Sequence, residues 1–124
     1  MAKVLGIGGI FFKSPDSKAL AAWYGEHLGL EISAWGGAQL TFDRLPAGQY
    51  AVWSPFAANT KHFDPSPKDF MFNLIVDDVS AALQQVKAGG AELVGEIDES
   101  DYGRFGWFLD PDGNKVELWQ PPAA

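Results

Sequence analysis

Glu117 is the residue of this sequence with the clearest capacity for chemistry. It lies near the end of the chain in the run 115–119, where polar and apolar side chains alternate. Alternate residues of a strand share a face, so Glu117 is expected on the face opposite Val116 and Leu118. A carboxylate partly removed from water among aromatic rings can act as a general base. It can also bind a cationic ligand, with cation–π attraction from nearby tryptophans.

The same alternation predicts a concave surface around Glu117. In the run 70–76 the wholly apolar face is expected under a helix, which leaves Met71 and Asn73 on the open side. Aromatic walls with one carboxylate and one amide are typical of a small-molecule site. Glu117 is therefore the candidate catalytic residue. The candidate ligand-binding residues are Phe11, Trp53, Met71, Asn73, Tyr102, Arg104, Trp107 and Trp119.

Simpler interpretations of these residues stay open. Glu117 could form an ordinary ion pair with a neighbouring cation, namely Lys13, Lys115 or Arg104. Tyr102 and Arg104 could reach the rim of the concave surface as hydroxyl and charge donors, or they could lie in a surface turn.

The two histidines give little further evidence for a catalytic or metal site, and the chain has no thiol. His27 falls on an apolar helical stripe, where packing is the expected role. His62 lies in a proline-rich linker and is expected at the surface, unless the linker folds over the concave surface. The chain has no cysteine, which excludes disulfides, thiolate metal sites and cysteine nucleophiles.

Two short helices are expected to position these residues. Ser14 is the expected N-cap of the first, which carries an apolar stripe over 20–28 and stops at Gly29. Asp78 is the expected N-cap of the second, which stops at Gly89. Each helix is too short to be stable alone and must lie against a sheet.

The two halves of the chain follow the same pattern of elements. Superimposing Asp16 on Asp78 gives an offset of 62 residues, half of the 124-residue chain, and indicates a duplication. Half 1 is residues 1–56, the linker 57–69 and half 2 residues 70–124. The predicted fold is α+β, with two βαβββ modules forming curved mixed sheets around a cup and helices on the outside. The expected strands are 4–12, 30–34, 39–43, 49–53, 70–76, 92–96, 105–109 and 115–119.

Composition narrows the class of protein. With 47% hydrophobic and 20% charged residues in 124, the chain is expected to form one folded domain. The net charge of -7 argues against nucleic-acid binding, which needs a basic face. No apolar run approaches the roughly 20 residues that span a bilayer, and no signal peptide is evident, so a cytoplasmic protein without membrane contact is expected.

Three runs of sequence carry a resemblance to a known family. The first is Asp-Pro-Asp-Gly-Asn-Lys-Val-Glu-Leu over 110–118, which ends on the strand of Glu117. The second is Trp-Tyr followed by Leu-Gly-Leu within 23–30, and the third is Val-Asp-Asp-Val over 76–79. These runs resemble the terminal, first-helix and second-helix motifs of the vicinal-oxygen-chelate superfamily. That superfamily includes glyoxalase I, the extradiol dioxygenases and the bleomycin-resistance proteins.

The resemblance implies a divalent metal in the cup, held by His, Glu or Gln from the first and last strands of each half. Glu117 is the only matching ligand position, because Gly9 and Met71 fall at two of the others and Trp53 or a neighbour at the last. A register shift would replace Met71 with Asn73. Metal catalysis normally needs about three protein ligands, so neither a metal nor another cofactor is expected.

Two functions remain. The first is a metal-free protein of the glyoxalase/bleomycin-resistance type, whose aromatic-lined cup binds a cationic or aromatic small molecule. The alternative is a metal-dependent lyase, isomerase or dioxygenase of the superfamily, and Glu117 could also serve a metal-free general-base reaction. An interaction module has no positive motif. The resemblance also implies a homodimer.

Overall fold

The chain forms a small α+β domain in its computed structural model, which describes residues 1–3, 5 and 7–123. This confirms the α+β class predicted from the sequence. The helices are α1 (Ser17–Leu28) and α2 (Val79–Ala88), with a short 3₁₀ helix, η1 (Phe42–Arg44). The strands are β1 (Phe72–Ile75), β2 (Glu92–Leu93), β3 (Asp98–Ser100), β4 (Gly103–Leu109) and β5 (Lys115–Gln120).

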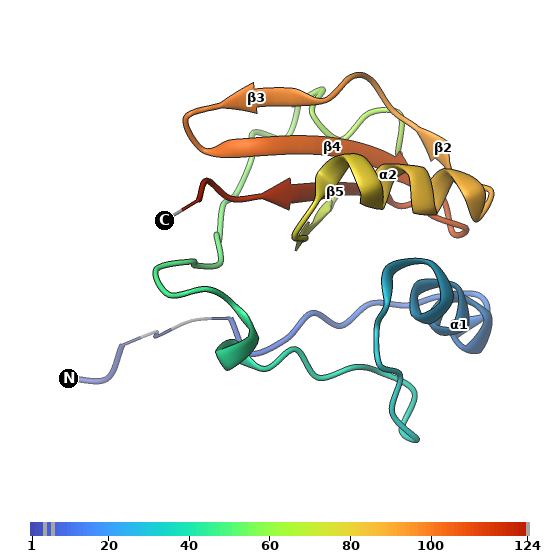
Figure 1. Cartoon of the computed structure of the whole chain (residues 1–124), viewed down its shortest axis with the longest axis horizontal. Coiled ribbons are helices and arrows are strands. Elements are labelled where there is room, and N and C mark those ends of the chain that lie inside the picture. Colours follow the sequence, from blue (N-terminus) through green and yellow to red (C-terminus); the bar gives the residue numbers. More distant parts are fainter. Residues whose placement is uncertain (4, 6, 124) are drawn as a thin grey trace.

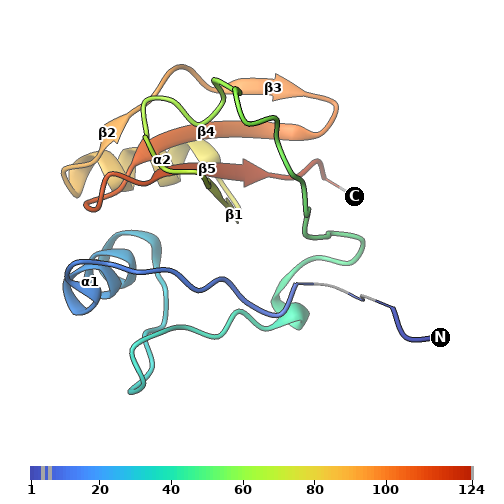
Figure 2. The same ribbon diagram turned by 180° about the vertical axis from the view of Figure 1, so that it is seen from behind.

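These strands form one mixed, open sheet. Its order is β1-β5-β4-β2, and β3 pairs with the far end of β4. β1 runs parallel to β5, and the other pairs are antiparallel. α2 covers one face of the sheet, and the linker runs along the other (Figures 1 and 2). β5 therefore has a strand on each side and a covering layer on each face.

Both helices begin at an aspartate. The carboxylates of Asp16 and Asp78 each accept a hydrogen bond, at 3.0 Å, from the backbone amide three residues later. The predicted cap at Asp78 is confirmed. The predicted cap at Ser14 is wrong, because Asp16 supplies the oxygen that reaches the free amide of the first turn. α1 ends at Gly29 as predicted, with a φ of 72° that glycine adopts without strain.

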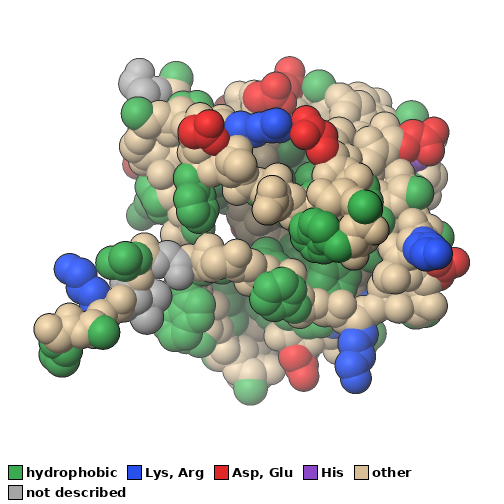
Figure 3. Space-filling view, turned by 90° about the horizontal axis from the view of Figure 1, so that it is seen from below, with side chains coloured by type: hydrophobic (Ala, Val, Ile, Leu, Met, Phe, Trp, Pro, Cys, Tyr) green, Lys and Arg blue, Asp and Glu red, His purple; other side chains and the backbone are tan. Residues whose placement is uncertain are grey.

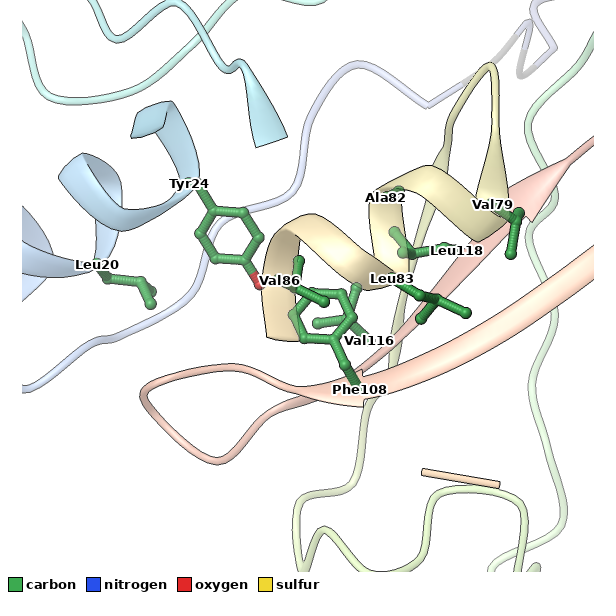
Figure 4. Close-up of a cluster of buried hydrophobic side chains, with 9 residues drawn as sticks. All are labelled: Leu20, Tyr24, Val79, Ala82, Leu83, Val86, Phe108, Val116 and Leu118. Carbon is green, nitrogen blue, oxygen red and sulfur yellow. The ribbon is translucent and has the colours of Figure 1, made fainter. Parts of the chain in front are cut away.

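The core lies between α2 and the sheet (Figure 4). Phe108 of β4 and Val116 and Leu118 of β5 are fully buried and pack against Val79 and Val86 of α2. The burial of Val116 and Leu118 is the one that the alternation over 115–119 predicts. Gly106 of β4 has no side chain at the tightest point of this contact. A Cβ at that position would lie 2.7 Å from the Leu83 side chain, so α2 packs directly on the β4 backbone.

A buried hydrogen bond joins α1 to the second half. The Tyr24 hydroxyl donates to Asp110 Oδ2 at 2.9 Å, and burial beside this carboxylate raises the pKa of Tyr24 well above its ordinary value. Asp110 also accepts from the backbone amides of Asp112 and Asn114 and from the Asn114 side chain. The Asp-Pro-Asp-Gly-Asn run therefore both turns the chain from β4 to β5 and receives the first helix.

The strands predicted in the first half, over 4–12, 30–34, 39–43 and 49–53, are wrong for the described residues of those ranges; residues 4 and 6 lie outside them. Outside α1, the described backbone hydrogen bonds of this half close local turns, such as Ser33 to Gly37 and Gln49 to Pro46. An extended segment becomes a strand only when another backbone pairs with it, and alternation of side chains does not supply that partner. The described residues of the first half lie beside the sheet as α1, η1 and chain without strands (Figure 1).

In the second half the predicted strands are present with shifted ends, and β3 was missed. The run Asp98–Ser100 is short, polar and exposed, so it carries no apolar alternation to mark it. Among the described residues, no helix has the length and apolar character needed to cross a membrane. The cytoplasmic location stays a prediction.

Tyr24→Phe should lower the free energy of unfolding by about 1.5–3 kcal/mol, because it removes a hydrogen bond to a buried carboxylate. Urea denaturation monitored by tryptophan fluorescence measures the change. The folded-state pKa of Tyr24 is raised, so its stabilising contribution is present below the unfolded value of about 10 and is lost as the pH rises above it. The deficit of Tyr24→Phe should therefore narrow at alkaline pH.

Tyr50→Phe is the matched control, because Tyr50 is exposed and lies edge-on to Trp119 through its ring. It should change stability by less than about 0.5 kcal/mol. Equal losses in the two variants would contradict a structural role for the Tyr24–Asp110 bond.

Candidate functional site

The Glu117 carboxylate is held between two neighbouring strands. On β5, Glu117 stands opposite Asn73 of β1 on one side and opposite Trp107 of β4 on the other. Asn73 Nδ2 donates to Glu117 Oε1 at 2.7 Å, and Trp107 Nε1 donates to Oε2 at 2.8 Å. The side chain is 13% exposed. Strand register alone therefore surrounds a nearly buried carboxylate with an amide and an indole.

His62 covers this carboxylate from the linker. Its Nε2 lies 3.2 Å from Glu117 Oε2. Its ring stacks on Phe56 with an interplanar angle of 1° and a centroid distance of 5.5 Å, and it meets Trp107 edge-on at 88°. The sequence left open whether the linker would fold over this site, and the structure places His62 of the linker against Glu117.

Lys115 fastens the linker to the sheet. Its ammonium donates to the His62 carbonyl oxygen at 2.6 Å and lies 5.7 Å from the Trp107 ring centroid. Burial lowers the pKa of the Lys115 ammonium, and the carboxylates of Glu117 and Asp64 oppose that change. Lys115 is thus directed to the linker backbone, and it makes no ion pair with Glu117 among the described residues.

The predicted site residues divide into two groups. Asn73 and Trp107 contact Glu117 directly. Trp119 is buried on the same face of β5 and stacks on Phe105 with an interplanar angle of 4°. Its indole donates to the Tyr102 carbonyl oxygen at 2.8 Å, so Tyr102 takes part through its backbone. Met71 is half-buried immediately before β1.

The other predicted residues do not meet Glu117. Phe11 and Trp53 are 94% and 81% exposed, because the strands expected to carry them do not form. Arg104 turns to the α2 side of the sheet, where it contacts Ser80 and the Glu99 carboxylate. The simple ion pair of Arg104 with Glu117 is therefore excluded in this structure.

Sequence reasoning missed Phe56 as part of the site, considered Lys115 only as an ion-pair partner of Glu117, and left open whether His62 would cover it. Strand alternation had placed Lys115 on the face of Glu117, and that signal was available. His62 and Phe56 lie in and beside an irregular linker, where no periodicity relates a residue to a face of the sheet.

The surroundings of Glu117 fit a hydrogen-bonded carboxylate better than a divalent ion. No group of three or more His, Cys, Asp or Glu side chains is placed to hold a metal anywhere in the described part of the chain. Both carboxylate oxygens face N–H donors, and a donating N–H cannot bind a cation. Gly9 and Met71 offer no hard oxygen or nitrogen side-chain ligand.

Comparison with known proteins shows which family this chain belongs to. The family model of the glyoxalase-like domain matches residues 9–119. TnmS3, an antibiotic-binding protein from a Streptomyces species, is 26% identical, with 88% of each chain covered and a TM-score of 0.51. A glyoxalase-related enzyme from Fulvimarina pelagi is 21% identical over 95% of this chain and 84% of that chain, with a TM-score of 0.50, which shows likeness of fold alone.

Two further matches cover less than half of each chain. A member of the glyoxalase/bleomycin resistance protein/dioxygenase superfamily from Sphaerobacter thermophilus is 30% identical, but the chain spans only 40% of its length, with a TM-score of 0.36. The chain likewise spans 48% of a hypothetical protein from S. aureus. No curated protein matches the sequence.

Proposed function

This chain belongs to the glyoxalase-like domain family of the vicinal-oxygen-chelate superfamily, and we propose that it binds a small molecule at Glu117 without a metal ion. One observation carries the proposal. The Glu117 carboxylate is 13% exposed, and its described hydrogen-bond partners are an amide, an indole and an imidazole. A nearly buried carboxylate without a lysine or arginine partner is costly unless a ligand or these dipoles compensate its charge.

The chemistry around Glu117 favours an aromatic or cationic ligand. Trp107 and Phe56, which both contact the His62 ring, supply flat surfaces beside one negative charge. An aromatic face and a carboxylate together attract a planar cation by stacking, cation–π attraction and ion pairing. The net charge of -7 adds long-range attraction for cations. TnmS3 is described as antibiotic-binding, which supports binding of a small molecule as the class of function.

A planar cation should therefore bind more tightly than its neutral counterpart. We expect 9-aminoacridine, protonated at neutral pH, to bind the protein, and Glu117→Gln to weaken this binding at least tenfold, about 1.4 kcal/mol. Binding of acridine, which is neutral and of similar shape, should change little in the variant. Quenching of tryptophan fluorescence and isothermal titration calorimetry measure both affinities.

Glu99→Gln is the control for charge alone, because Glu99 is an exposed carboxylate on β3 that pairs with Arg104. It should leave 9-aminoacridine affinity within about twofold of the parent protein. Equal weakening by the two variants would contradict a site at Glu117 and would indicate non-specific attraction to an acidic surface.

The alternative function, a metal-dependent lyase, isomerase or dioxygenase, requires a bound divalent ion. Protein purified after growth with added Ni, Zn, Mn and Fe is expected to contain no metal at stoichiometric level, as measured by inductively coupled plasma mass spectrometry. One metal ion per chain, lost in Glu117→Gln, would reject the metal-free proposal and favour the alternative.

The proposal includes a homodimer, because the first half leaves large apolar side chains in water. Phe11 and Trp53 are 94% and 81% exposed, and Leu40 and Phe42 are also exposed. Figure 3, which views the molecule from the side of the first half, shows hydrophobic side chains gathered around a hollow. Large exposed apolar patches on a protein surface often mark interaction sites. The unpaired extended segments of this half can be covered by a second copy.

Sedimentation equilibrium should therefore give a mass of twice the 13.4 kDa chain. Replacing Phe11 and Trp53 together by serine should shift the equilibrium to the monomer, because it removes two large apolar contacts. A monomer at micromolar concentration in the parent protein would contradict this part of the proposal.

A further inference from the structure

The His62 ring lies against the Glu117 carboxylate, between Phe56 and Trp107. It is a planar nitrogen heterocycle that lies flat on Phe56, at an interplanar angle of 1°, and edge-on to Trp107. Its Nε2 is 3.2 Å from Glu117 Oε2. An ionised carboxylate only accepts hydrogen bonds, so a ring nitrogen at this position contacts it favourably as an N–H donor. The contacts are those of a bound heterocycle, although the ring belongs to the chain itself.

The backbone of His62 is held separately from its ring. Lys115 Nζ donates to the His62 carbonyl oxygen at 2.6 Å, and the His62 amide donates to Thr60 Oγ1 at 3.2 Å. The ring, by contrast, has one described hydrogen bond, the one to Glu117, and its side chain is 39% exposed. Rotation of the side chain can therefore move the ring into solvent while the linker keeps its attachment to the sheet.

We infer that His62 is an internal stand-in for the ligand, and that the ligand is a planar nitrogen heterocycle that donates an N–H to Glu117 while it stacks on Phe56. This inference rests on the proposed small-molecule function and names its ligand class. Asn73 and Trp107 already supply donors to the two carboxylate oxygens, and the third donor is the one that the ring provides. A ring with only acceptor atoms would face the carboxylate with like partial charge and is excluded from this position.

The His62 ring also lowers the apparent affinity of the site for a ligand. A ligand binds only the fraction of molecules in which the His62 ring has left Glu117, so its apparent dissociation constant is the intrinsic one divided by that fraction. Removal of the ring should therefore tighten binding of any heterocycle of this class. It should also leave a space that matches imidazole itself.

The experiment uses His62→Ala with imidazole and benzimidazole as probes. Both probes should raise the melting temperature of His62→Ala and quench its tryptophan fluorescence with at least tenfold higher affinity than in the parent protein. The combined variant His62→Ala with Glu117→Gln should lose this gain. 9-Aminoacridine should bind His62→Ala more tightly than the parent protein.

Two control variants distinguish the effect of the His62 N–H from the effect of emptying the space that the ring fills. His62→Leu keeps an apolar side chain over the site without an N–H, so it should bind imidazole no better than the parent protein. His27→Ala removes the other histidine, which packs on Trp23 away from Glu117, and it should show no gain in imidazole affinity. His62→Leu also serves if His62→Ala folds poorly, because its affinity for 9-aminoacridine tests whether the carboxylate site is intact.

Failure of this inference is distinguishable from failure of the proposed function. Equal imidazole affinity in His62→Ala and the parent protein, with Glu117-dependent binding of 9-aminoacridine in both, would overturn the stand-in and leave the small-molecule site. Absence of any Glu117-dependent binding in the parent protein and in His62→Ala would overturn both.

Discussion

The rest of the structure depends on the position of β5 between β1 and β4. A strand with a neighbour on each side has each residue fixed laterally by two others, and its two faces are covered independently. On one face Val116 and Leu118 are fully buried under α2. On the other face the same register sets Glu117 between Asn73 and Trp107. Core and site are thus two faces of one strand, so a slip by one residue would bury the carboxylate under α2 and expose the core.

The turn that delivers β5 to this position has a second role. The Asp110 carboxylate accepts hydrogen bonds from the backbone amides of Asp112 and Asn114 in the loop. It also accepts one from the Tyr24 hydroxyl of α1. The same carboxylate therefore stabilises both the conformation of the loop and the contact of α1 with the second half. Trp23 reinforces the same contact, because its indole donates to the Gly89 carbonyl oxygen at the end of α2. The two helices meet at this corner, whereas the described extended chain of the first half contacts the second half through aromatic pairs such as Phe12 with Phe72 and Tyr50 with Trp119.

A carboxylate near the middle of a sheet needs compensation for its lost water. Here three nitrogen groups of three different origins lie within hydrogen-bond distance of it: an amide on β1, an indole on β4 and an imidazole on the linker. Two belong to the sheet and are fixed by register. The third is carried by a segment that Lys115 holds through its backbone. The exchangeable partner is therefore the imidazole, and the sheet keeps the carboxylate in place when that ring moves.

The sequence by itself determined the features that depend on neighbours along the chain. Alternation over 115–119 separated Glu117 from Val116 and Leu118, and Asp78, Gly29 and Gly89 marked helix ends correctly. Only the tertiary structure decided which segments pair and what lies over Glu117. The described residues of the strands expected to carry Phe11 and Trp53 do not pair with another backbone, and His62 reached the site through a linker without periodicity. Side-chain alternation and capping are local and leave a pattern in the sequence. Pairing of distant backbones and the path of an irregular segment depend on contacts between residues far apart in the chain, and no local pattern records them.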